Sequence, residues 1–467
     1  MADGRIPPGP RNTLLVGNLL RYMRDPLGFL TRCAREYGDV VRLRAPCRTF
    51  YLLSHPDHIE HVLRSGHRGF IKWKPLRDTG RLFGSGLLTS EGDFWRRQRR
   101  LATPAFQGKQ VQSYADVMVG QTLRLIESWR AGETRTVSDD MVRLTLAILT
   151  KTLFDVDPDD ADAMGPVLAG VLDYFGNPAN SLLLPRWLPT PSALRFRRAV
   201  RSLDEMIARM IAERRAHPTA GQELLSQLLH AEDEDGQRMT DRQLRDELVT
   251  LAFAGHKTTA AALTYCFYLL TQSPEADARL AAEVRDVLGD RPPTAADVPN
   301  LPFAECVVKE ALRLYPPSWG IGREALGDEE IGGYAVPRGT QLVLVQWVVQ
   351  RDPRWFDEPD AFRPQRWQND LESRLPRCAY FPFGDGPRVC IGARFALLET
   401  VLALATAVRR YRLELVPGQK FRLVPSITLW PRPGIRMVVC ERGRASGLRA
   451  SEVAPGKHGR GKASAGE

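Results

Sequence analysis

The sequence predicts a mainly α-helical protein with minor β-sheets, a fold of the α+β class. Between Asp93 and Ser273, segment after segment carries apolar residues at spacings of three and four, which is typical of amphipathic helices. Short strand-like runs occur in the first ninety residues and again after residue 330. No linker rich in Pro, Gly or Ser interrupts residues 20–440, so we expect one large domain over residues 1–441.

The first ninety residues are expected to form a small sheet packed against helices. Strands are predicted at residues 40–43 and 50–53, with a helix at 56–65. Pro and Asp-Gly punctuation then separates a series of helices. These helices are predicted at residues 94–103, 109–130, 138–154, 193–217, 221–231 and 240–272.

The helix predicted at residues 240–272 is unusually long and becomes apolar on nearly all sides after Leu248, so we expect it to cross the centre of the molecule. The remaining elements are expected in chain order. They are a helix at residues 303–315 ended by Pro316 and Pro317, strand-like residues 334–349, an irregular stretch 351–389, a helix 391–409 and a closing hairpin 425–440 with a Pro-Gly turn.

Charge and composition bound the possible functions. Of the net charge of +10, about four charges fall in residues 442–467, where six Lys/Arg face two Glu in a Gly/Ser/Ala-rich context, so we expect a basic, disordered tail. Neither a signal peptide nor an apolar run of membrane-spanning length is found, which predicts a cytoplasmic protein without a transmembrane segment. The seven cysteines lack the spacings of a disulfide framework or a zinc site. Nothing indicates a nucleic-acid partner.

The most informative stretch is FPFGDGPRVCIGARFALLE, residues 381–399. Cys390 follows a loop rich in Gly and Pro and precedes a helix, where free backbone N–H groups and the helix dipole favour a thiolate. Gly384, Gly386 and Gly392 allow close backbone approach and unusual torsions. A lone cysteine is ordinarily a small buried hydrophobe, but in this context we expect an iron ligand.

This stretch resembles the haem-binding loop of the cytochrome P-450 family. The positions that match are Phe383, Gly384, Gly386, Arg388, Cys390 and Gly392. The resemblance implies that Cys390 is the axial thiolate of haem b (iron protoporphyrin IX), and that Phe383 packs beside the sulfur and limits water.

A second motif is KEALRLYPP, in which Glu310 and Arg313 lie three apart on one helix face. Alone, such a pair is an ordinary surface ion pair worth about 0–1 kcal/mol. Its position before Cys390 resembles the Glu-x-x-Arg motif of the family, whose third member matches Arg366 in FRPQRW. The resemblance implies a buried Glu310–Arg313–Arg366 cluster with a structural role, bracing the loop on the haem side.

The third motif is AFAGHKTTAA, residues 252–261. Gly255 and Thr258 together permit a local widening of the helix. The family resemblance implies a groove for oxygen and water, with Thr258 as the catalytic hydroxyl and Ala254 beside the cofactor. Lys257 stands where the family usually has Asp or Glu. It either shuttles protons with a lowered pKa or pairs with an acid such as Asp246 or Glu247.

The fourth motif is WRRQR, where Trp95 and Arg99 share one helix face. The resemblance implies that both contact a haem propionate, together with Arg388 and with Arg323 after the Pro316-Pro317 turn. The opposite face is either an ordinary solvated face or part of a docking surface for an acidic electron donor. That face carries Arg96, Arg97 and Arg100.

As a whole, the resemblance implies the cytochrome P-450 fold, with the long helix over the haem, and a monomeric monooxygenase. It would insert one oxygen atom into a hydrophobic small molecule, with electrons from a separate ferredoxin or flavodoxin and its reductase. Five segments are expected to line the substrate pocket: residues 68–88, 168–184, 254–258, 318–322 and 427–429. The alternatives are a haem-thiolate peroxygenase or isomerase that needs no external electrons, favoured only by Lys257, and a haem sensor or carrier.

Overall fold

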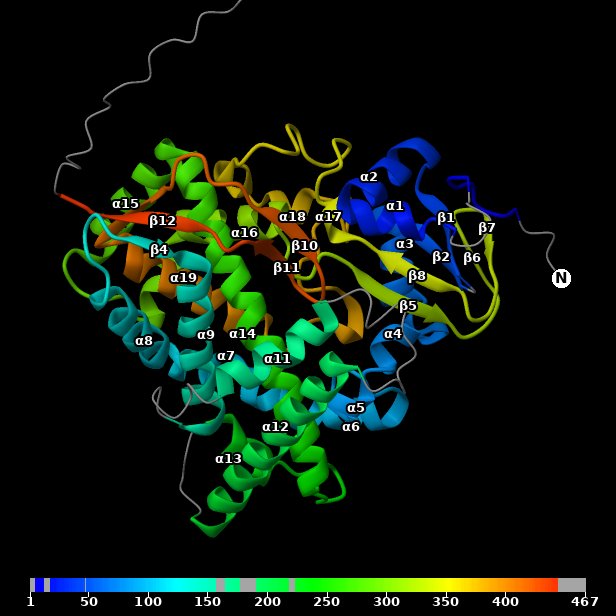
Figure 1. The fold of residues 1–467 in the computed structure, drawn as a ribbon, viewed down its shortest axis with the longest axis horizontal. Helices are drawn as coiled ribbons and strands as arrows, with labels where there is room; N and C mark the ends of the chain where they lie inside the picture. The colour runs from blue at the N-terminus through cyan, green and yellow to red at the C-terminus, as the bar shows by residue number, and fades with distance from the viewer. Residues whose placement is uncertain are drawn as a thin grey trace, which may run out of the picture.

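The fold is described from a computed structural model that covers residues 5–11, 17–46, 48–156, 164–176, 190–217 and 223–443. The helices are α1 (Leu19–Arg24), α2 (Pro26–Tyr37), α3 (Pro56–Glu60), α4 (Lys74–Arg77), α5 (Gly80–Phe83), α6 (Gly92–Ala102), α7 (Gly108–Ser113), α8 (Ala115–Glu127), α9 (Val137–Phe154), α11 (Met164–Gly176), α12 (Pro191–Ala216), α13 (Leu224–His230), α14 (Asp241–Gln272), α15 (Pro274–Leu288), α16 (Pro302–Leu314), α17 (Gln346–Val349), α18 (Leu371–Arg374) and α19 (Ala393–Val408). The predicted mainly helical architecture is confirmed, since helices make up most of the molecule and the largest sheet lies at one side, on the right in Figure 1.

The strands are β1 (Val40–Ala45), β2 (Arg48–Leu53), β3 (Phe70–Lys72), β4 (Thr134–Thr136), β5 (Ile321–Ala325), β6 (Glu329–Ile331), β7 (Tyr334–Val336), β8 (Gln341–Leu344), β9 (Tyr411–Leu415), β10 (Arg422–Pro425), β11 (Leu429–Arg432) and β12 (Arg436–Glu441). The largest sheet has the order β1-β2-β8-β5-β3, and β2 and β8 are its parallel pair. In the antiparallel pairing of β3 with β5, Lys72 lies opposite Arg323. Residues directly opposite project to the same face, so two cations from distant parts of the chain are brought together.

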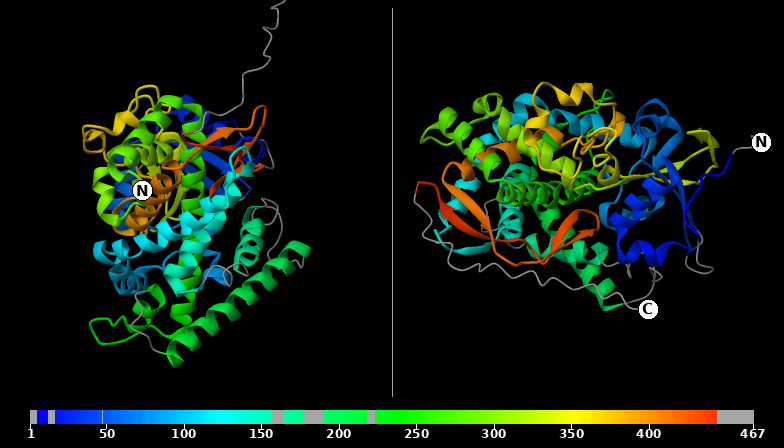
Figure 2. Two further views of the ribbon diagram at one scale, coloured as in Figure 1. Left: turned by 90° about the vertical axis from the view of Figure 1, so that its left-hand side faces the viewer. Right: turned by 90° about the horizontal axis from the view of Figure 1, so that it is seen from above.

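The long helix α14 passes through the middle of the molecule (Figure 2). Thr240 begins it with a reciprocal capping box to Gln243, and the helix ends before Pro274, which cannot continue it. It packs against α9, α12, α16 and α19, so its residues are buried on nearly every side. The expected central position is confirmed.

Four expectations about elements are wrong. The helix expected at 109–130 is two helices, α7 and α8, that meet at Tyr114. Residues 346–349 form α17 instead of continuing a strand. The closing hairpin turns at residues 426–428, because β11 pairs with β10 while β12 pairs with β4 and β9. Gly392 adopts an ordinary φ of −88°, so it does not supply the unusual torsion expected of it.

The C-terminal boundary also differs from the expectation. Arg442 belongs to the folded body, since its guanidinium donates to the Asp277 carboxylate at 2.5 and 2.9 Å and to the Val408 carbonyl at 2.7 Å. The rest of the predicted tail, residues 444–467, lies outside the described residues. Across the described part of the chain, none of the helices is both long and apolar enough to span a bilayer.

Candidate active site

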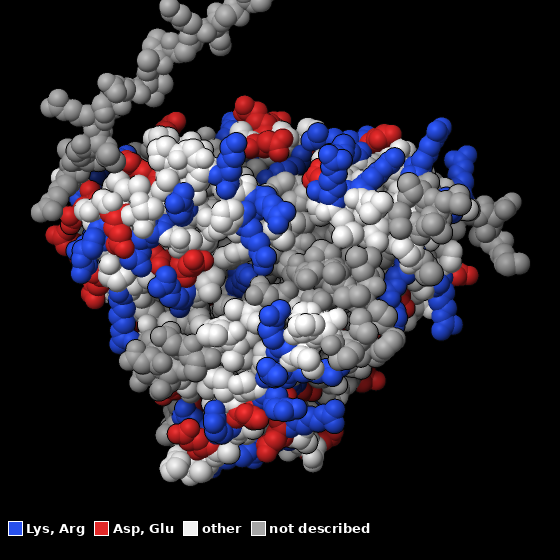
Figure 3. All heavy atoms as spheres, viewed as in Figure 1, with Lys and Arg blue, Asp and Glu red and all other residues white. Residues whose placement is uncertain are grey.

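A cavity of about 2190 Å³ lies against the middle of α14. The loop before α19, the β5 strand, helix α6 and the β10–β11 hairpin contribute to its walls. All five predicted lining segments supply wall residues, although residues 177–184 of the second segment lie outside the described part of the chain. Lys and Arg side chains gather around the hollow near the centre of the face seen in Figure 3. The cavity is larger than the roughly 300–1,000 Å³ of a typical ligand pocket, so it can hold a cofactor together with a substrate.

Cys390 lies in this wall and is exposed to the cavity. Its backbone N–H donates to the Phe383 carbonyl at 2.9 Å, which fixes the loop. Burial raises the pKa of the Cys390 thiol, against the opposing effects of the Gly392 amide and the positive charge of Arg99. The Gly392 amide and the charge of Arg99 therefore act toward the thiolate, as expected of this loop, while burial acts against it. A bound metal ion would favour the thiolate further.

Two glycines before Cys390 are required by the loop geometry. Gly384 and Gly386 have φ of +75° and +72°, a region that L side chains rarely adopt. At Gly386, a Cβ would also lie 2.0 Å from the Leu63 carbonyl oxygen. The loop can pass this close to the helical turn before Gly66 only with glycine there.

Cations outnumber anions at one end of the cavity. The guanidinium of Arg388 pairs with Glu91 and lies 4.9 Å from the centre of the Trp95 ring. Within the described residues its Nη1 is buried without a hydrogen-bond partner. Arg323 is buried and donates to the Gly322 carbonyl, and burial together with Arg388 lowers its pKa to about 10.

Lys72 belongs to the same cluster and was not foreseen from the sequence. Its Nζ donates to the carbonyls of Leu87 and Ser90 at 2.8 and 2.6 Å, and burial followed by the charge of Arg388 lowers its pKa to about 7. Glu91, whose carboxylate accepts from the Lys72 amide at 2.8 Å, was missed as well. Neither belongs to a recognisable motif. The pairing of β3 with β5 places Lys72 opposite Arg323, while Glu91 lies at the start of α6 and pairs with Arg388. Such an excess of buried cations suits a ligand with anionic groups.

Helix α6 presents two different faces. Trp95 and Arg99 both line the cavity, as their spacing predicts. On the other face, Arg97 pairs with Asp233 at 2.5 Å, Arg96 pairs with Asp93 and Arg100 pairs with Glu234. The suggested docking surface on this helix is therefore largely neutralised.

On α14, Ala254, Gly255 and Thr258 face the cavity. The Thr258 hydroxyl donates to the Ala254 carbonyl at 2.6 Å, which leaves its oxygen able to accept a hydrogen bond. A Cβ at Gly255 would lie 2.5 Å from a methyl carbon of Leu149, so glycine here allows α9 to pack closely. The structure assigns α-helix without interruption through this segment, so the predicted local widening is not seen.

Lys257 does not line the cavity. Its ammonium lies 4.8 Å from the centre of the Trp430 ring on β11, and its charge acts on Asp139 of α9. Pairing with Asp246 or Glu247 is ruled out, because ten or eleven residues of helix separate them by about 15–16 Å. The two suggested acids have other partners: Asp246 accepts from the Ser85 amide and Glu247 from the Leu87 amide.

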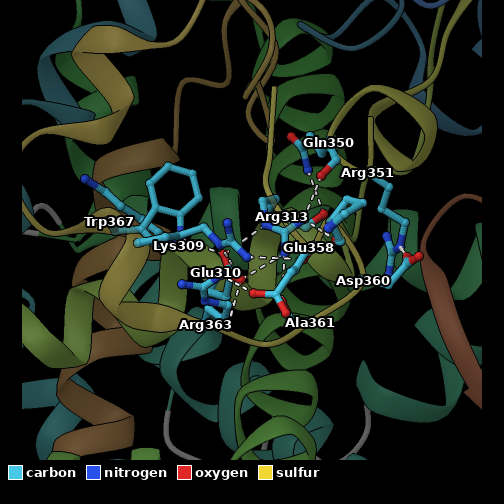
Figure 4. A network of polar contacts seen from close by, with 12 residues as sticks. Lys309, Glu310, Arg313, Gln350, Arg351, Glu358, Asp360, Ala361, Arg363 and Trp367 are labelled. Atoms are coloured by element: carbon cyan, nitrogen blue, oxygen red, sulfur yellow. Dashed lines mark hydrogen bonds and ion pairs between the residues drawn. The ribbon is translucent and has the colours of Figure 1, made fainter. Parts of the chain in front are cut away.

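The Glu310–Arg313–Arg366 cluster is formed as predicted. Both Glu310 and Arg313 are fully buried, and their side chains form two parallel bonds of 2.8 and 2.9 Å (Figure 4). Arg366 adds a bond of 3.0 Å and the Trp367 indole one of 2.8 Å to the same carboxylate. The remaining donors of Arg313 go to backbone carbonyls of residues 350, 359 and 361. The cluster thereby ties α16 to the irregular stretch that precedes Cys390.

A cysteine sulfur in the wall of a large cavity, an excess of cations beside it and a long helix across from it define the site of a haem-thiolate enzyme. Residues 7–438 match the family model described as Cytochrome P450. The chain belongs to the cytochrome P450 family, and it is a haem-thiolate monooxygenase.

The relatives and a solved structure agree with this assignment. The chain is 36% identical over 438 residues to cyclooctatin synthase of Streptomyces melanosporofaciens, covering 92% of this chain and 94% of that protein. It is 34% identical over 448 residues to pentalenene oxygenase of Streptomyces avermitilis, covering 94% and 97%. The crystal structure of the cytochrome P450DA heme domain superposes with a TM-score of 0.86 at 29% identity, covering 94% of this chain and 98% of that one.

The family's cofactor is haem, and the site fits it. Cys390 offers a sulfur donor to iron. The orphaned Nη1 of Arg388 and the buried Arg323 and Lys72 lie where two anionic propionates would relieve their charge. The cavity wall contributed by α14 and the Cys390 loop includes small or apolar residues, Ala254 and Phe383 among them.

Proposed function

We propose that this chain hydroxylates or epoxidises a terpenoid hydrocarbon, using dioxygen and two electrons from a separate protein. The observation that carries the proposal is the apolar wall of the cavity beyond Cys390, which would select its ligand by shape. That wall includes Phe83, Leu87, Leu88, Leu149, Leu153 and Phe253. In support, one relative that is 36% identical over 413 residues is named cyclooctat-9-en-7-ol 5-monooxygenase, and another is named pentalenene oxygenase.

Each site residue then has a role. Cys390 would ligate the iron, with Phe383 packed beside the sulfur and Gly392 donating its amide to it. Trp95, Arg99, Arg323, Arg388 and Lys72 would hold the propionates, and Ala254 would lie against the cofactor. The haem, when bound, supplies the activation of dioxygen from which one atom is inserted. Thr258 Oγ1 accepts a hydrogen bond from a water and holds it in place for proton transfer. Lys257 takes no direct part, because it lies outside the cavity wall.

The electron donor is proposed to be a small acidic ferredoxin or flavodoxin, supplied by its own reductase. The net charge of +10 supports an acidic partner. Because the α6 arginines are paired, other Lys and Arg residues would form the contact surface. The rate of electron transfer is then expected to fall as ionic strength rises.

Absorbance spectra test the proposal. The reduced protein under carbon monoxide should give the red-shifted Soret band of a thiolate-ligated haem, and terpenoid hydrocarbons should shift the spin state of the ferric protein at lower concentrations than fatty acids or steroids do. Product should form with dioxygen and a ferredoxin system. Absence of the shifted Soret band would overturn haem-thiolate ligation, and product formation with hydrogen peroxide alone would favour a peroxygenase.

Thr258→Ala tests the role of the hydroxyl. We expect about tenfold or greater loss of product per electron consumed, with a matching rise in peroxide, because the water is no longer held. Thr264→Ala is the matched control. Thr264 makes the same bond to a carbonyl one turn back on α14, at 2.7 Å, but is buried away from the cavity. Full coupling in Thr258→Ala would remove the role assigned here.

A further inference from the structure

A polar strip runs along α14 on the side of the cavity. Glu247, Thr250, Ala254 and Thr258 follow one another at spacings of three and four, so they share one face of the helix over about 16 Å. Thr250, Ala254 and Thr258 all line the cavity, and Glu247 lies one turn beyond its edge. Glu247 and Thr250 are both buried. A carboxyl group is thus placed in line with the hydroxyl that holds water.

Two atoms of this strip are buried without a partner in the described part of the chain. Glu247 Oε2 accepts from the Leu87 amide at 2.9 Å, but its Oε1 has no hydrogen-bond partner, nor has Thr250 Oγ1. Ser90 Oγ, on the neighbouring loop, is in the same condition. Buried polar atoms in native proteins are nearly always paired, by ordered water where no protein group is in reach. Water is therefore expected between Glu247 and Thr250.

The Glu247 carboxyl is suited to exchanging protons near neutral pH. Burial is the main cause that raises its pKa to about 7, and the neighbouring charge of Asp246 acts in the same direction. The Leu87 amide and the Lys72 ammonium oppose the shift. Lys72 in turn has a pKa of about 7, with Arg388 lowering it and Glu91 raising it. Both protonation states of Glu247 are accessible under physiological conditions.

Charged side chains lead from this carboxyl to the surface. Asp246 pairs with Arg245 at 2.9 Å, and Arg245 also pairs with Asp204 of α12. The exposed fraction of these side chains rises from 6% at Asp246 through 18% at Arg245 to 42% at Asp204, while Glu247 is fully buried. A line of charged side chains therefore joins the surface to Asp246, the residue next to Glu247 in the chain.

We propose that Glu247 is a positioning residue for proton delivery in this chain, supplying protons along α14 through Thr250 to the water held by Thr258. A proton leaves Glu247 Oε1 and passes through bridging water to Thr250 Oγ1, whose own proton moves on. Further water in the cavity, along the roughly 12 Å of helix past Ala254, carries that proton to the water held by Thr258. The carboxylate left behind takes the next proton from solvent beside Asp246, so the group is unchanged after each transfer. This route replaces the carboxylate that usually precedes the threonine, a position held here by Lys257, which faces Trp430. The inference rests on the proposed function.

Infrared spectroscopy tests the carboxyl without turnover. Difference spectra of the ferric holoprotein between pH 5 and pH 9 should contain the C=O stretch of a buried carboxylic acid that titrates near pH 7 and shifts in D₂O. The band should vanish in Glu247→Gln, which keeps an oxygen for the Leu87 amide. It should remain in Glu283→Gln, the matched control, because Glu283 also accepts backbone amides, at 2.7 and 2.9 Å, but lies outside the cavity wall.

Turnover then tests the relay itself. Glu247→Gln and Thr250→Val should each lower kcat by about tenfold or more, enlarge the solvent isotope effect and leave KM for the substrate unchanged. Glu247→Asp should recover part of the rate, and Glu283→Gln should match the unsubstituted protein. The pH profile of kcat should lose its step near pH 7 only in Glu247→Gln.

The outcomes separate the two proposals. An unchanged isotope effect and kcat in both Glu247→Gln and Thr250→Val would overturn the relay. If Glu247→Gln fails to fold, Thr250→Val decides alone, and full activity in that variant is the overturning result. If the unsubstituted protein shows no monooxygenation of any hydrocarbon, the proposed function fails, whereas the infrared band still reports whether Glu247 titrates. Absence of that band overturns the relay whatever the substrate is.

Discussion

At the scale of single residues, the site depends on charges that are buried and must find partners. Glu310 receives five bonds, two from Arg313 and one each from Arg366, the Arg363 amide and the Trp367 indole. Burial opposes ionisation of Glu310, but the two guanidinium groups outweigh it and lower its pKa. A fully satisfied network of this kind fixes the geometry of the chain around it. Because the cluster ties α16 to the stretch that precedes Cys390, it can fix the position of the Cys390 loop from outside the cavity.

Removal of this carboxylate should therefore be costly. In Glu310→Ala, Arg313 and Arg366 become buried cations without a counter-ion, and we expect the free energy of unfolding in urea to fall by about 3–5 kcal/mol, with loss of haem during purification. Arg363→Ala is the control. It removes only an exposed ion pair with Glu358, and the loss should stay below about 1 kcal/mol. Equal losses in the two variants would contradict the structural role of Glu310.

The glutamate and arginine of this cluster could be predicted because they follow a local pattern and a resemblance. Lys72 and Glu91 could not be predicted, because their importance comes from β-strand pairing and burial. Similarly, the sequence singled out Lys257 as a departure from the family, but it could not indicate that the side chain points to Trp430 instead of the cavity.

At the scale of elements, α14 is the helix that the sequence predicted best. Its role in the site nevertheless depends on tertiary packing. Its cap, its length and its apolar character all follow from local residues. Which of its faces borders the cavity depends on α9, α5 and α19 packing around it. His256 is buried against α9, whose Thr145 hydroxyl donates to its carbonyl.

This burial predicts a pH dependence of stability. Burial first, and the charge of Lys257 second, lower the pKa of His256 to about 4, whereas the unfolded chain has the ordinary value near 6.5. Between pH 6.5 and pH 4, His256 binds a proton in the unfolded state but stays neutral in the folded state. The stability that neutral His256 contributes above pH 6.5 is therefore lost as the pH falls toward 4. The contribution of His256 should decrease by about 2 kcal/mol between pH 7.5 and pH 5.

Urea unfolding at both pH values gives the change in the free energy of unfolding on acidification. The change in the unsubstituted protein minus the change in His256→Gln is the contribution of His256. His217→Gln serves as the control, because it removes an imidazole at an exposed helix end instead of a buried one. If His256→Gln has the same loss of stability on acidification as the unsubstituted protein, the side chain does not titrate as burial requires.

At the scale of the whole molecule, the cavity joins parts that are distant in the chain. Lys72 comes from β3, Arg99 from α6, Arg323 from β5, and Arg388 and Cys390 from the loop before α19. The sheet and the helical body therefore meet at a shared excess of positive charge. Haem, with its propionates, should act as the common counter-ion and stabilise the junction.

The effect of one substitution on stability should therefore differ between the haem-free and the haem-loaded chain. Arg323→Met removes a buried cation whose only hydrogen bond in the described structure is to the Gly322 carbonyl. In the haem-free chain we expect unchanged or raised resistance to urea. In the haem-loaded chain we expect haem to dissociate about tenfold faster, because a charge-assisted bond is lost. Arg285→Met, on the exposed side of α15, should change neither quantity. A lower resistance of the haem-free Arg323→Met variant to urea would contradict the excess of positive charge assigned to this site.

The sequence by itself determined the mainly helical class, most helix positions, the cysteine loop and the Glu310–Arg313 pair, because these follow from local spacing and from residue types that few other contexts require. Only the tertiary structure decided the strand partners of the last segments, the cation cluster, the direction of Lys257 and the burial of Glu247 and Thr250 beside the cavity. Each of these depends on which distant parts of the chain come into contact and on which side chains that contact buries. The spacing of neighbouring residues does not encode such long-range contacts.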